Sequence, residues 1–263
     1  MSKPNWQIAI RCLVASFLLI LAGLASAAEL DNFDQAHRDQ RAAQLQLLAG
    51  EPPSGFKAGL TSVSSRETFG SDRSVAGVLR QVSRSGSTLS LGDFGKGRVE
   101  VELAYQLAEP ISEPVANEAA LRAKVARVAP ALEFPDLALL GGKPESVLAI
   151  VRGNVAAHSA VVGAATELVE LEPNELIARL YRDDRRVSTS PARAVIGGQW
   201  QALLDLINTL VAAGWSLYPD QWLLTGALDG MHPLQAGRYR LVVDGLGELE
   251  VVVAAAATAY PRN

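Results

Sequence analysis

Strict alternation of apolar and polar residues predicts a β-strand in "GRVEVELAYQL", residues 97–107. Its odd-numbered positions, from Val99 to Leu107, are apolar and share one face, whereas Glu100 and Glu102 lie on the other. Glutamate is a poor strand former. The pair therefore has two interpretations: a solvated outer face beside a buried one, or two carboxylates directed at one cation.

Similar patterns predict the other elements. Apolar residues at helical spacing predict helices, and short apolar runs between Gly-rich turns predict strands. The expected helices are residues 29–50, 117–128 and 198–214. The expected strands are residues 75–82, 146–154, 160–169, 175–187, 221–228, 237–243 and 247–253. Residues 55–62 are expected to form a short strand that runs into a turn. Residues 63–75 show no clear period and are expected to form a loop.

These elements predict an α+β fold with a β-rich core and long helices packed against it. We expect an N-terminal helical segment at residues 28–53 and one domain at residues 54–263. The helix at 117–128 is expected to stop at Pro130, because proline cannot continue a helix.

The first 27 residues have the layout of a secretory signal peptide. Lys3 and Arg11 precede a continuous apolar run, and Ala25 and Ala27 provide small-residue spacing for cleavage after Ala27. The alternative is an uncleaved membrane anchor, for which the run is short. Cleavage would remove Cys12, the only cysteine, and would leave a periplasmic or secreted protein without a disulfide or a thiolate nucleophile.

Composition narrows the class of protein further. The 263 residues are 49% hydrophobic and 20% charged, as in a globular protein with a large core. The formal net charge is −4 and no basic stripe is present, which argues against a nucleic-acid partner.

A second acidic feature bears on the glutamate pair. Neighbouring carboxylates on one strand face repel each other and favour a cation between them. Mg²⁺ binds through one or more carboxylates and keeps waters that substrate oxygens can replace. Glu133, in the apolar "PALEFPD", is a candidate third ligand, because a bare charge there would be costly. The sequence alone leaves a solvated pair and a metal site both open.

The order of several motifs resembles the fumarylacetoacetate hydrolase superfamily. Along the chain stand "GFKAGLTS", "AGVL", "RVEVELAYQL", "PALEFPD", "GGQWQALLDLINTLVAAGWSLYPDQWLLTG" and "LQAGRYRLVVDGLGELEV". Within the superfamily, the 2-keto-4-pentenoate hydratase and 4-oxalocrotonate decarboxylase branch is the most similar. The resemblance covers about residues 54–253, most of the chain after the signal peptide.

This resemblance implies a β-rich roll around a central helix, as in the fumarylacetoacetase C-terminal domain. It implies that Glu100, Glu102 and Glu133 bind Mg²⁺ or Mn²⁺ and that Lys57 faces the substrate. The implied activity is that of a lyase, a hydratase or a decarboxylase, acting on a small 2-oxo acid. Relatives form homo-oligomers, so a homo-oligomer is expected here.

Asp136 is kept from the pattern of this branch, and it is counted among the candidate catalytic residues. His158 lies near a position where the branch usually has an Asp-Asn pair, and it is a candidate substitute acid–base group. An exposed or structural histidine is the alternative.

The chain also departs from this pattern. Gly153 replaces an expected aspartate, Ala156 and Ala157 stand where serines are common, and Ala138 replaces an arginine. These changes reduce the number of side chains that could orient water or relay protons. They motivate an alternative hypothesis: an exported, catalytically weakened relative that binds a small acid or a metal. A fumarylpyruvate- or acylpyruvate-type hydrolase is a third hypothesis.

Overall fold

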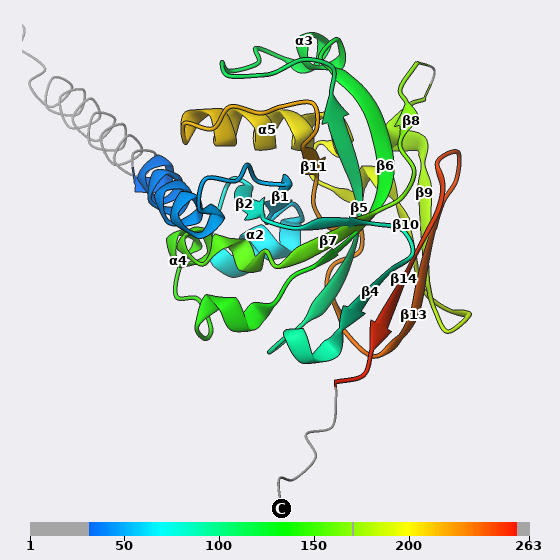
Figure 1. The fold of residues 1–263 in the computed structure, drawn as a ribbon. Helices are drawn as coiled ribbons and strands as arrows, with labels where there is room; N and C mark the ends of the chain where they lie inside the picture. Colours follow the sequence, from blue (N-terminus) through cyan, green and yellow to red (C-terminus); the bar gives the residue numbers. More distant parts are fainter. Residues whose placement is uncertain (1–31, 170, 257–263) are drawn as a thin grey trace, which may run out of the picture.

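The computed structural model describes residues 32–169 and 171–256. Two β-sheets and a few helices form the mixed α+β fold expected from the sequence (Figure 1). The expected signal peptide lies outside the described residues. Among the residues that are described, no helix is both long enough and apolar enough to cross a membrane.

The larger sheet contains nine strands in the order β2-β1-β11-β5-β6-β7-β3, with β12 beside β5 and β8 beside β6. The two longest strands, β5 and β6, are antiparallel neighbours in its middle. The strands are β1 (Gly55–Gly59), β2 (Val75–Leu79), β3 (Val82–Arg84), β5 (Arg98–Leu107), β6 (Val125–Phe134), β7 (Ser159–Val162), β8 (Thr166–Glu167), β11 (Trp222–Leu224) and β12 (His232–Pro233).

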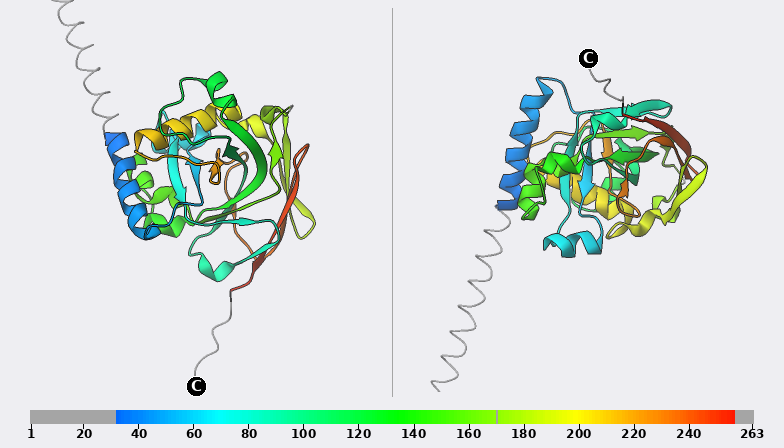
Figure 2. Two further views of the ribbon diagram at one scale, coloured as in Figure 1. Left: turned by 45° about the horizontal axis from the view of Figure 1, so that its top comes forward. Right: turned by 90° about the horizontal axis from the view of Figure 1, so that it is seen from below.

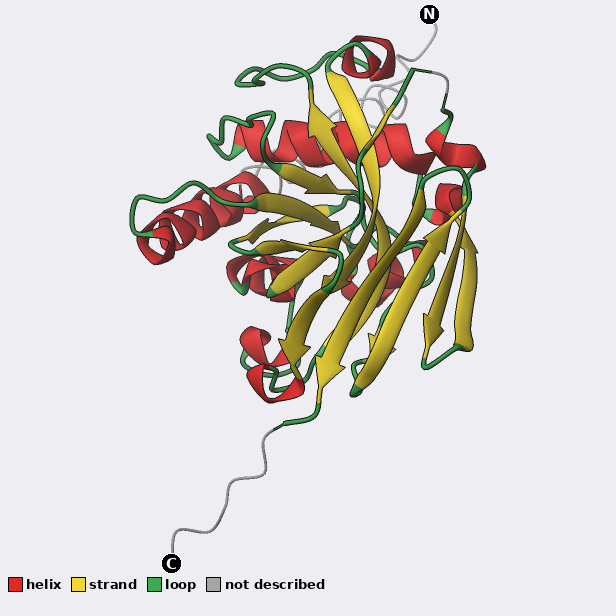
Figure 3. Ribbon diagram, turned by 45° about the vertical axis from the view of Figure 1, so that its right-hand side comes forward, coloured by secondary structure: helices red, strands yellow, loops and turns green. Residues whose placement is uncertain are grey.

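The smaller sheet has five strands in the order β10-β9-β13-β14-β4. These are β4 (Ser87–Ser90), β9 (Ile177–Arg182), β10 (Arg185–Pro191), β13 (Gly237–Val243) and β14 (Gly247–Ala254). Its apolar residues share one core with a face of the larger sheet and with helix α5 (Gly198–Ala212). Figure 3 shows the helices placed around these curved sheets.

Besides an N-terminal helix at residues 32–48, four α-helices are described: α2 (Val63–Phe69), α3 (Glu118–Arg122), α4 (Val147–Arg152) and α5 (Gly198–Ala212). Five short 3₁₀ turns are also described: η1 (Leu91–Asp93), η2 (Leu137–Leu140), η3 (Asn154–Ala156), η4 (Pro173–Glu175) and η5 (Ala192–Ala194). The predicted helix at 198–214 is confirmed as α5, and its apolar residues from Trp200 to Leu210 are buried.

Both faces of β5 are buried. Val101, Leu103 and the other odd-numbered residues join the main core, while Ala104 on the opposite face packs into a second cluster with Ala129 and Ala131 of β6. A central strand that is covered on both sides has no solvated face. The alternation in the sequence therefore separates two interior environments.

The predicted helix at 117–128 is wrong beyond its first turn and a half. It ends at Arg122, and the chain then enters β6, which contains Pro130. The Pro130 carbonyl accepts a bond from Gly163 N–H on the side away from β5, so its nitrogen also faces away from β5. On that side β8 pairs with residues 127–128 and β7 with residues 131–134. The missing N–H of proline therefore falls in a gap between two partner strands, which is where a strand tolerates it.

Two other short segments also differ from expectation. The expected strand at 146–154 is helix α4, capped by the Ser146 side chain, which accepts from Ala149 N–H. The expected loop at 63–75 contains α2, which starts with a reciprocal Ser62–Ser65 capping box and ends at left-handed Gly70. Short apolar runs do not distinguish strand from helix by period alone, and the caps decide these cases.

The N-terminal helix at residues 32–48 lies on the side of the molecule opposite β13 and β14 (Figure 2). It is anchored to β2 by polar side chains. His37 Nε2 accepts a bond from Ala76 N–H at 3.1 Å, and Gln40 Nε2 donates to Ala76 O at 2.7 Å. Its apolar residues are only partly buried, because Leu45 is 41% exposed.

We expect the contribution of His37 to the free energy of unfolding to decrease as the pH is lowered. Burial lowers the pKa of His37 below its ordinary value, and its Nε2 must stay unprotonated to accept from Ala76. A group with a depressed pKa contributes stability above its unfolded pKa of about 6.5 and loses it at lower pH. The difference in unfolding free energy between wild type and His37→Gln should therefore shrink from pH 7.5 to pH 5.5 in urea titrations. An equal difference at both pH values would contradict this assignment.

Candidate metal and substrate site

Three buried glutamates meet on the inner strands of the larger sheet. Glu100 on β5 lies directly opposite Glu133 on β6, and Glu102 lies two residues further along β5. One carboxylate oxygen of each lies within 4.8 Å of one oxygen of each of the others. Glu133 is therefore part of a strand. The sequence had indicated that it follows a helix, and this expectation is wrong. The pair Glu100–Glu102 is not a solvated face.

Lys57 supplies the positive charge beside this cluster. It lies on β1 between Phe56 and Ala58, both of which point into the main core, so its own side chain points to the other face. Lys57 Nζ is 3.1 Å from Glu133 Oε2, and both side chains are almost fully buried. One ammonium therefore faces three carboxylates in an interior where unpaired charges are costly.

The main chain holds one of the carboxylates. Gly226 N–H donates to Glu102 Oε2 at 2.6 Å. Gly226 has φ of +100°, and a Cβ at this position would lie only 2.2 Å from Thr61 Oγ1. Both the backbone conformation and the close approach require glycine.

A buried glutamine fixes the segment that carries Gly226. Gln199, on the first turn of α5, accepts from Thr225 Oγ1 at 2.6 Å and from the Tyr105 hydroxyl at 3.0 Å. Its amide nitrogen donates to Ala192 O at 2.6 Å. Because every polar atom of this buried amide is engaged, the network holds the end of β11 in one position.

Burial and mutual repulsion disfavour the charged forms of the three carboxylates, which raises their pKa values. Burial, with the added charge of Glu100, raises the pKa of Glu102 to about 8. Burial raises that of Glu133 to about 7 against the opposing effect of Lys57. The pKa of Glu100 is also raised, first by burial and then by Glu133. For Lys57 burial favours the neutral amine, but the three carboxylates together outweigh it and raise its pKa.

The donor set fits a hard divalent cation. Glu102 Oε1 and Glu133 Oε1 are buried and have no hydrogen-bond partner in the described structure. Two oxygens bound to one Mg²⁺ are at most about 4 Å apart, and the three candidate ligand oxygens lie within 4.8 Å of one another. Oxygen-only ligands suit Mg²⁺ and Mn²⁺. Glu100, Glu102 and Glu133 could therefore hold such an ion.

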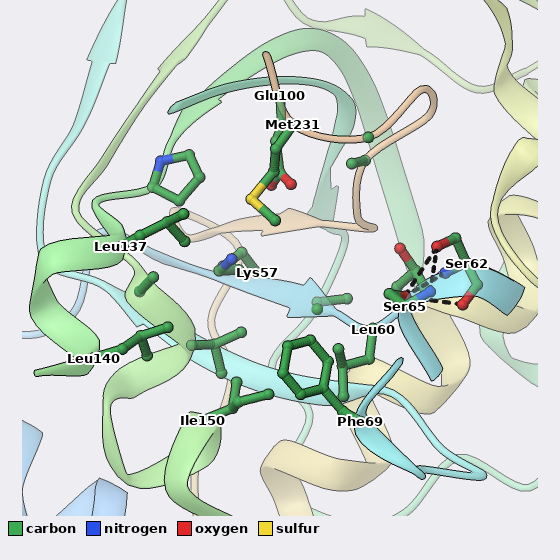
Figure 4. Close-up of a pocket in the computed structure, with 18 residues that line it drawn as sticks. Lys57, Leu60, Ser62, Ser65, Phe69, Glu100, Leu137, Leu140, Ile150 and Met231 are labelled. Carbon is green, nitrogen blue, oxygen red and sulfur yellow. Dashed lines mark hydrogen bonds between the residues drawn. The ribbon is translucent and has the colours of Figure 1, made fainter. Parts of the chain in front are cut away.

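A cavity of about 160 Å³ opens beside the cluster. Lys57 and Glu100 reach its surface, and most of the remaining wall is apolar (Figure 4). Thr61 and Ser62 also line it. A small molecule in this cavity would therefore meet charged groups at one end and hydrocarbon elsewhere.

One wall of the cavity is a strained turn. Asn154, Val155 and Ala156 are three successive left-handed residues, with φ of 52°, 53° and 56°. Such a conformation costs roughly 1–2 kcal/mol for a residue other than glycine. The Asn154 side chain offsets this cost, because it accepts from Val78 N–H at 2.8 Å and donates to Val78 O at 2.9 Å. Gln40 of the N-terminal helix also bonds to Asn154, at 3.3 Å.

Removing this side chain should lower stability markedly. We expect Asn154→Ala to cost about 2–4 kcal/mol, because Val78 loses both partners and alanine is less tolerant of a left-handed backbone. Asn154→Gly removes the same hydrogen bonds but relieves the backbone, so it should cost about 1 kcal/mol less. Chemical denaturation of both variants measures the two contributions. Equal stability of Asn154→Ala and wild type would refute the role of this side chain.

The structure does not place Asp136 or His158 on the cavity wall. Asp136 accepts bonds from the N–H groups of Gly95, Lys96 and Ala138, which lower its pKa despite the opposing effect of burial. His158 stacks on Phe94 with ring centroids 4.2 Å apart, and burial lowers its pKa. Asp136 thus has an evident structural role, and a catalytic role for either residue stays a prediction.

Sequence reasoning missed several residues of this region. Gln199 stands out only as a polar residue at the start of an apolar helix. The loop that carries Met231 into the cavity wall also contains Asp229, whose Oδ2 is 2.9 Å from His232 Nε2. Phe69 belongs to a segment expected to be a loop. No local pattern identifies these residues, since their role depends on which elements meet in the fold.

Comparisons with known proteins agree with this geometry, although no family model matches the chain. The 2-keto-4-pentenoate hydratase 1 of Dechloromonas aromatica (strain RCB) is 25% identical over 211 residues, or 79% of this chain and 80% of that protein. The 4-oxalocrotonate decarboxylase from Pseudomonas putida G7, complexed with calcium and acetate, has a TM-score of 0.75 at 19% identity, covering 84% of this chain and 85% of that chain. With magnesium and adipate the same decarboxylase gives 0.73 at 18% identity, covering 81% and 82%.

A more distant structure is the fumarylpyruvate hydrolase from Pseudomonas aeruginosa in complex with Mn²⁺ and pyruvate. Its TM-score is 0.59 at 18% identity, covering 76% of this chain and 88% of that chain. The sequence similarity confirms the predicted resemblance to the hydratase and decarboxylase branch. The structural similarity confirms the fumarylacetoacetase-like fold.

Proposed function

We propose that this homologue of 2-keto-4-pentenoate hydratases is a divalent-metal-dependent lyase, a hydratase or a decarboxylase, that acts on a small 2-oxo acid. The observation that carries the proposal is the buried cluster of Glu100, Glu102 and Glu133, paired with Lys57 at the edge of a small cavity. Similar proteins have been solved with magnesium, calcium or Mn²⁺ together with small carboxylic acids, which supports this assignment.

Several groups of the chain would contribute to this reaction. A bound divalent ion supplies a positive centre that stabilises negative charge developing on a carbonyl oxygen. Lys57 Nζ reaches the cavity surface, where it can donate to the acid group of the substrate and hold it in place. Gly226 N–H keeps Glu102 in a fixed orientation. The apolar walls exclude water and strengthen each of these electrostatic interactions.

Calorimetry on the purified chain tests the proposal. We expect Mg²⁺ and Mn²⁺ to bind and oxalate, a mimic of the planar 2-oxo acid head, to strengthen that binding at least tenfold. A screen of 2-oxo acids for turnover with bound metal would then distinguish a hydratase from a decarboxylase. The absence of metal binding at millimolar concentrations, with or without oxalate, would overturn the proposal.

A further inference from the structure

Side chains cover the free edge of the larger sheet. β2 is the last strand at one end of this sheet, and no further strand pairs with it among the described residues. The main-chain groups on such an edge need other partners. Ala76 N–H donates to His37 Nε2 at 3.1 Å, and Ala76 O accepts from Gln40 Nε2 at 2.7 Å. Asn154 binds both main-chain groups of Val78 in the same way, so three side chains take the place of a neighbouring strand.

Gln40 connects the N-terminal helix to the η3 turn. Its Nε2 donates to Asn154 Oδ1 at 3.3 Å as well as to Ala76 O, so one amide contacts both the turn and β2. The Gln40 side chain is buried, and its Oε1 has no hydrogen-bond partner in the described structure. Within the described residues, the bond to Asn154 is the only hydrogen bond between this helix and the turn. Replacing the amide would therefore release the turn from the helix.

The η3 turn lies on the face of the sheet that carries Lys57. Lys57 on β1 is directly opposite Gly77 on β2, and Gly59 is two residues further along β1, so all three share one face. A Cβ at Gly59 would lie 2.5 Å from Val155 Cγ1, and a Cβ at Gly77 would lie 3.0 Å from Asn154 O. The turn thus packs on two glycines beside Lys57, so closely that a side chain at either position would force it to move.

This turn also forms part of the cavity wall, because Val155 and Ala156 line the cavity together with Lys57. A misplacement of about 1 Å in a site can cost about 100-fold in rate, even when its cause is remote. We infer that Gln40 is a positioning residue, which holds the η3 turn against the Lys57 face so that Val155 shapes the space where the acid binds. This inference rests on the proposed function, because it takes the cavity beside Lys57 as the place where a small acid binds.

Calorimetry in saturating Mg²⁺ with oxalate and with 2-oxobutanoate tests the inference. Oxalate has two carbons and occupies only the end with the metal and Lys57, whereas 2-oxobutanoate extends two carbons further toward the wall. Gln40→Met keeps the size of the side chain and removes its donor. It should weaken binding of 2-oxobutanoate at least about fivefold and that of oxalate less than about twofold, because only the longer acid meets the displaced turn. The Mg²⁺ affinity should not change, since the candidate ligands lie on β5 and β6.

Gln44→Met provides the matched control. Gln44 lies one turn after Gln40 on the same helix and is 7% exposed, against 2% for Gln40. Its Oε1 has no partner, and no hydrogen bond joins its side chain to β2 or to the η3 turn within the described residues. This control should leave the ratio of the two acid affinities unchanged, whereas a general loss of stability would affect both glutamine variants.

A double-variant cycle tests the path through the turn. Val155→Ala should reproduce the selective loss of 2-oxobutanoate binding. Adding Gln40→Met to Val155→Ala should weaken that binding less than about twofold further, because both changes act on the same contact.

The results separate this inference from the proposed function. If oxalate does not bind to the wild type in Mg²⁺, the proposed function is overturned and the inference with it. If oxalate binds and Gln40→Met leaves the ratio of the two affinities unchanged, the proposed function stands and the inference is overturned. An equal change of ratio in Gln44→Met, or full additivity with Val155→Ala, would also overturn it. Should Gln40→Met fail to fold, Gln40→Asn places the amide one carbon short of its partners and should give the same selective loss.

Discussion

Glu102→Gln is expected to weaken Mg²⁺ binding at least 100-fold and to abolish turnover. The substitution removes one of the three negative charges of the candidate ligands and keeps nearly the same side-chain shape. It also replaces the unpartnered Oε1 or the oxygen bonded to Gly226 with an NH₂ group, which repels both a cation and an N–H donor. Calorimetry with Mg²⁺ and with Mn²⁺ measures the effect.

The same substitution should stabilise the metal-free protein. The pKa of Glu102 is about 8 in the folded chain and about 4.5 in the unfolded one. A raised pKa contributes stability below the unfolded value, and that stability is lost as pH rises through the folded value. In EDTA, Glu102→Gln should therefore exceed wild type in stability by about 2 kcal/mol at pH 8.5, with a smaller difference at pH 6.

Glu248→Gln provides the matched control. Glu248 and Glu250 form another E-x-E pair, on β14, and their side chains are 59% and 41% exposed. The control should change neither metal affinity nor the stability in EDTA by more than about 0.5 kcal/mol. A metal site elsewhere would be indicated if Glu102→Gln bound Mg²⁺ as tightly as this control.

Lys57→Met should destabilise the metal-free chain by about 3–5 kcal/mol near pH 7.5, because it leaves a buried carboxylate cluster without its cation. The residual charge on Glu133 would then have no partner within 4 Å among the described residues. Added Mg²⁺ should restore much of this stability, since the metal replaces the lost positive charge. Thermal unfolding with EDTA and with Mg²⁺ measures both effects.

Measurements of turnover and of Mg²⁺ binding distinguish the role of Lys57 from that of the glutamates. Lys57→Met should retain Mg²⁺ binding and yet lose at least about 100-fold in kcat/KM, because the acid group of the substrate loses its donor. Lys143→Met, on an exposed loop, is the control and should alter neither property. Full activity of Lys57→Met would exclude a role for this residue in substrate binding or catalysis.

The two E-x-E pairs also show how far the sequence could predict the site. Both pairs occur in strands with alternating apolar residues, and both strands were predicted correctly. One pair is buried and the other exposed, because β5 lies inside a sheet that is covered on both faces. Burial of the second face depends on distant segments, so strand periodicity could not decide between a solvated face and a metal site. The resemblance to a family supplied that decision.

Glu133 shows a second limit of prediction from the sequence. The residue was identified as a candidate ligand, but it was placed after a helix, because apolar residues at helical spacing predicted a helix at 117–128 and Pro130 was taken as its stop. Its actual position depends on strand pairing with β5, and Pro130 fits because β6 changes partner there. Local propensity was therefore overridden by tertiary pairing.

The apolar half of the cavity could not be predicted at all. It is built from α2, η2, α4 and the η3 turn, of which one was expected to be a loop and another a strand. Each element is less than eight residues long, so its sequence carries little periodic information. Their common location follows from packing around β1 and β2.

The register between β5 and β6 has a consequence for how such a protein can evolve. Moving either strand by one residue would turn Glu100 or Glu133 to the opposite face of the sheet. Insertions and deletions in these strands are thus excluded for as long as the carboxylate cluster is needed. The short elements α2, η2, α4 and η3 around the apolar part of the cavity carry no such restriction. New substrate preferences can therefore arise by exchanging those elements while the reaction chemistry is inherited intact.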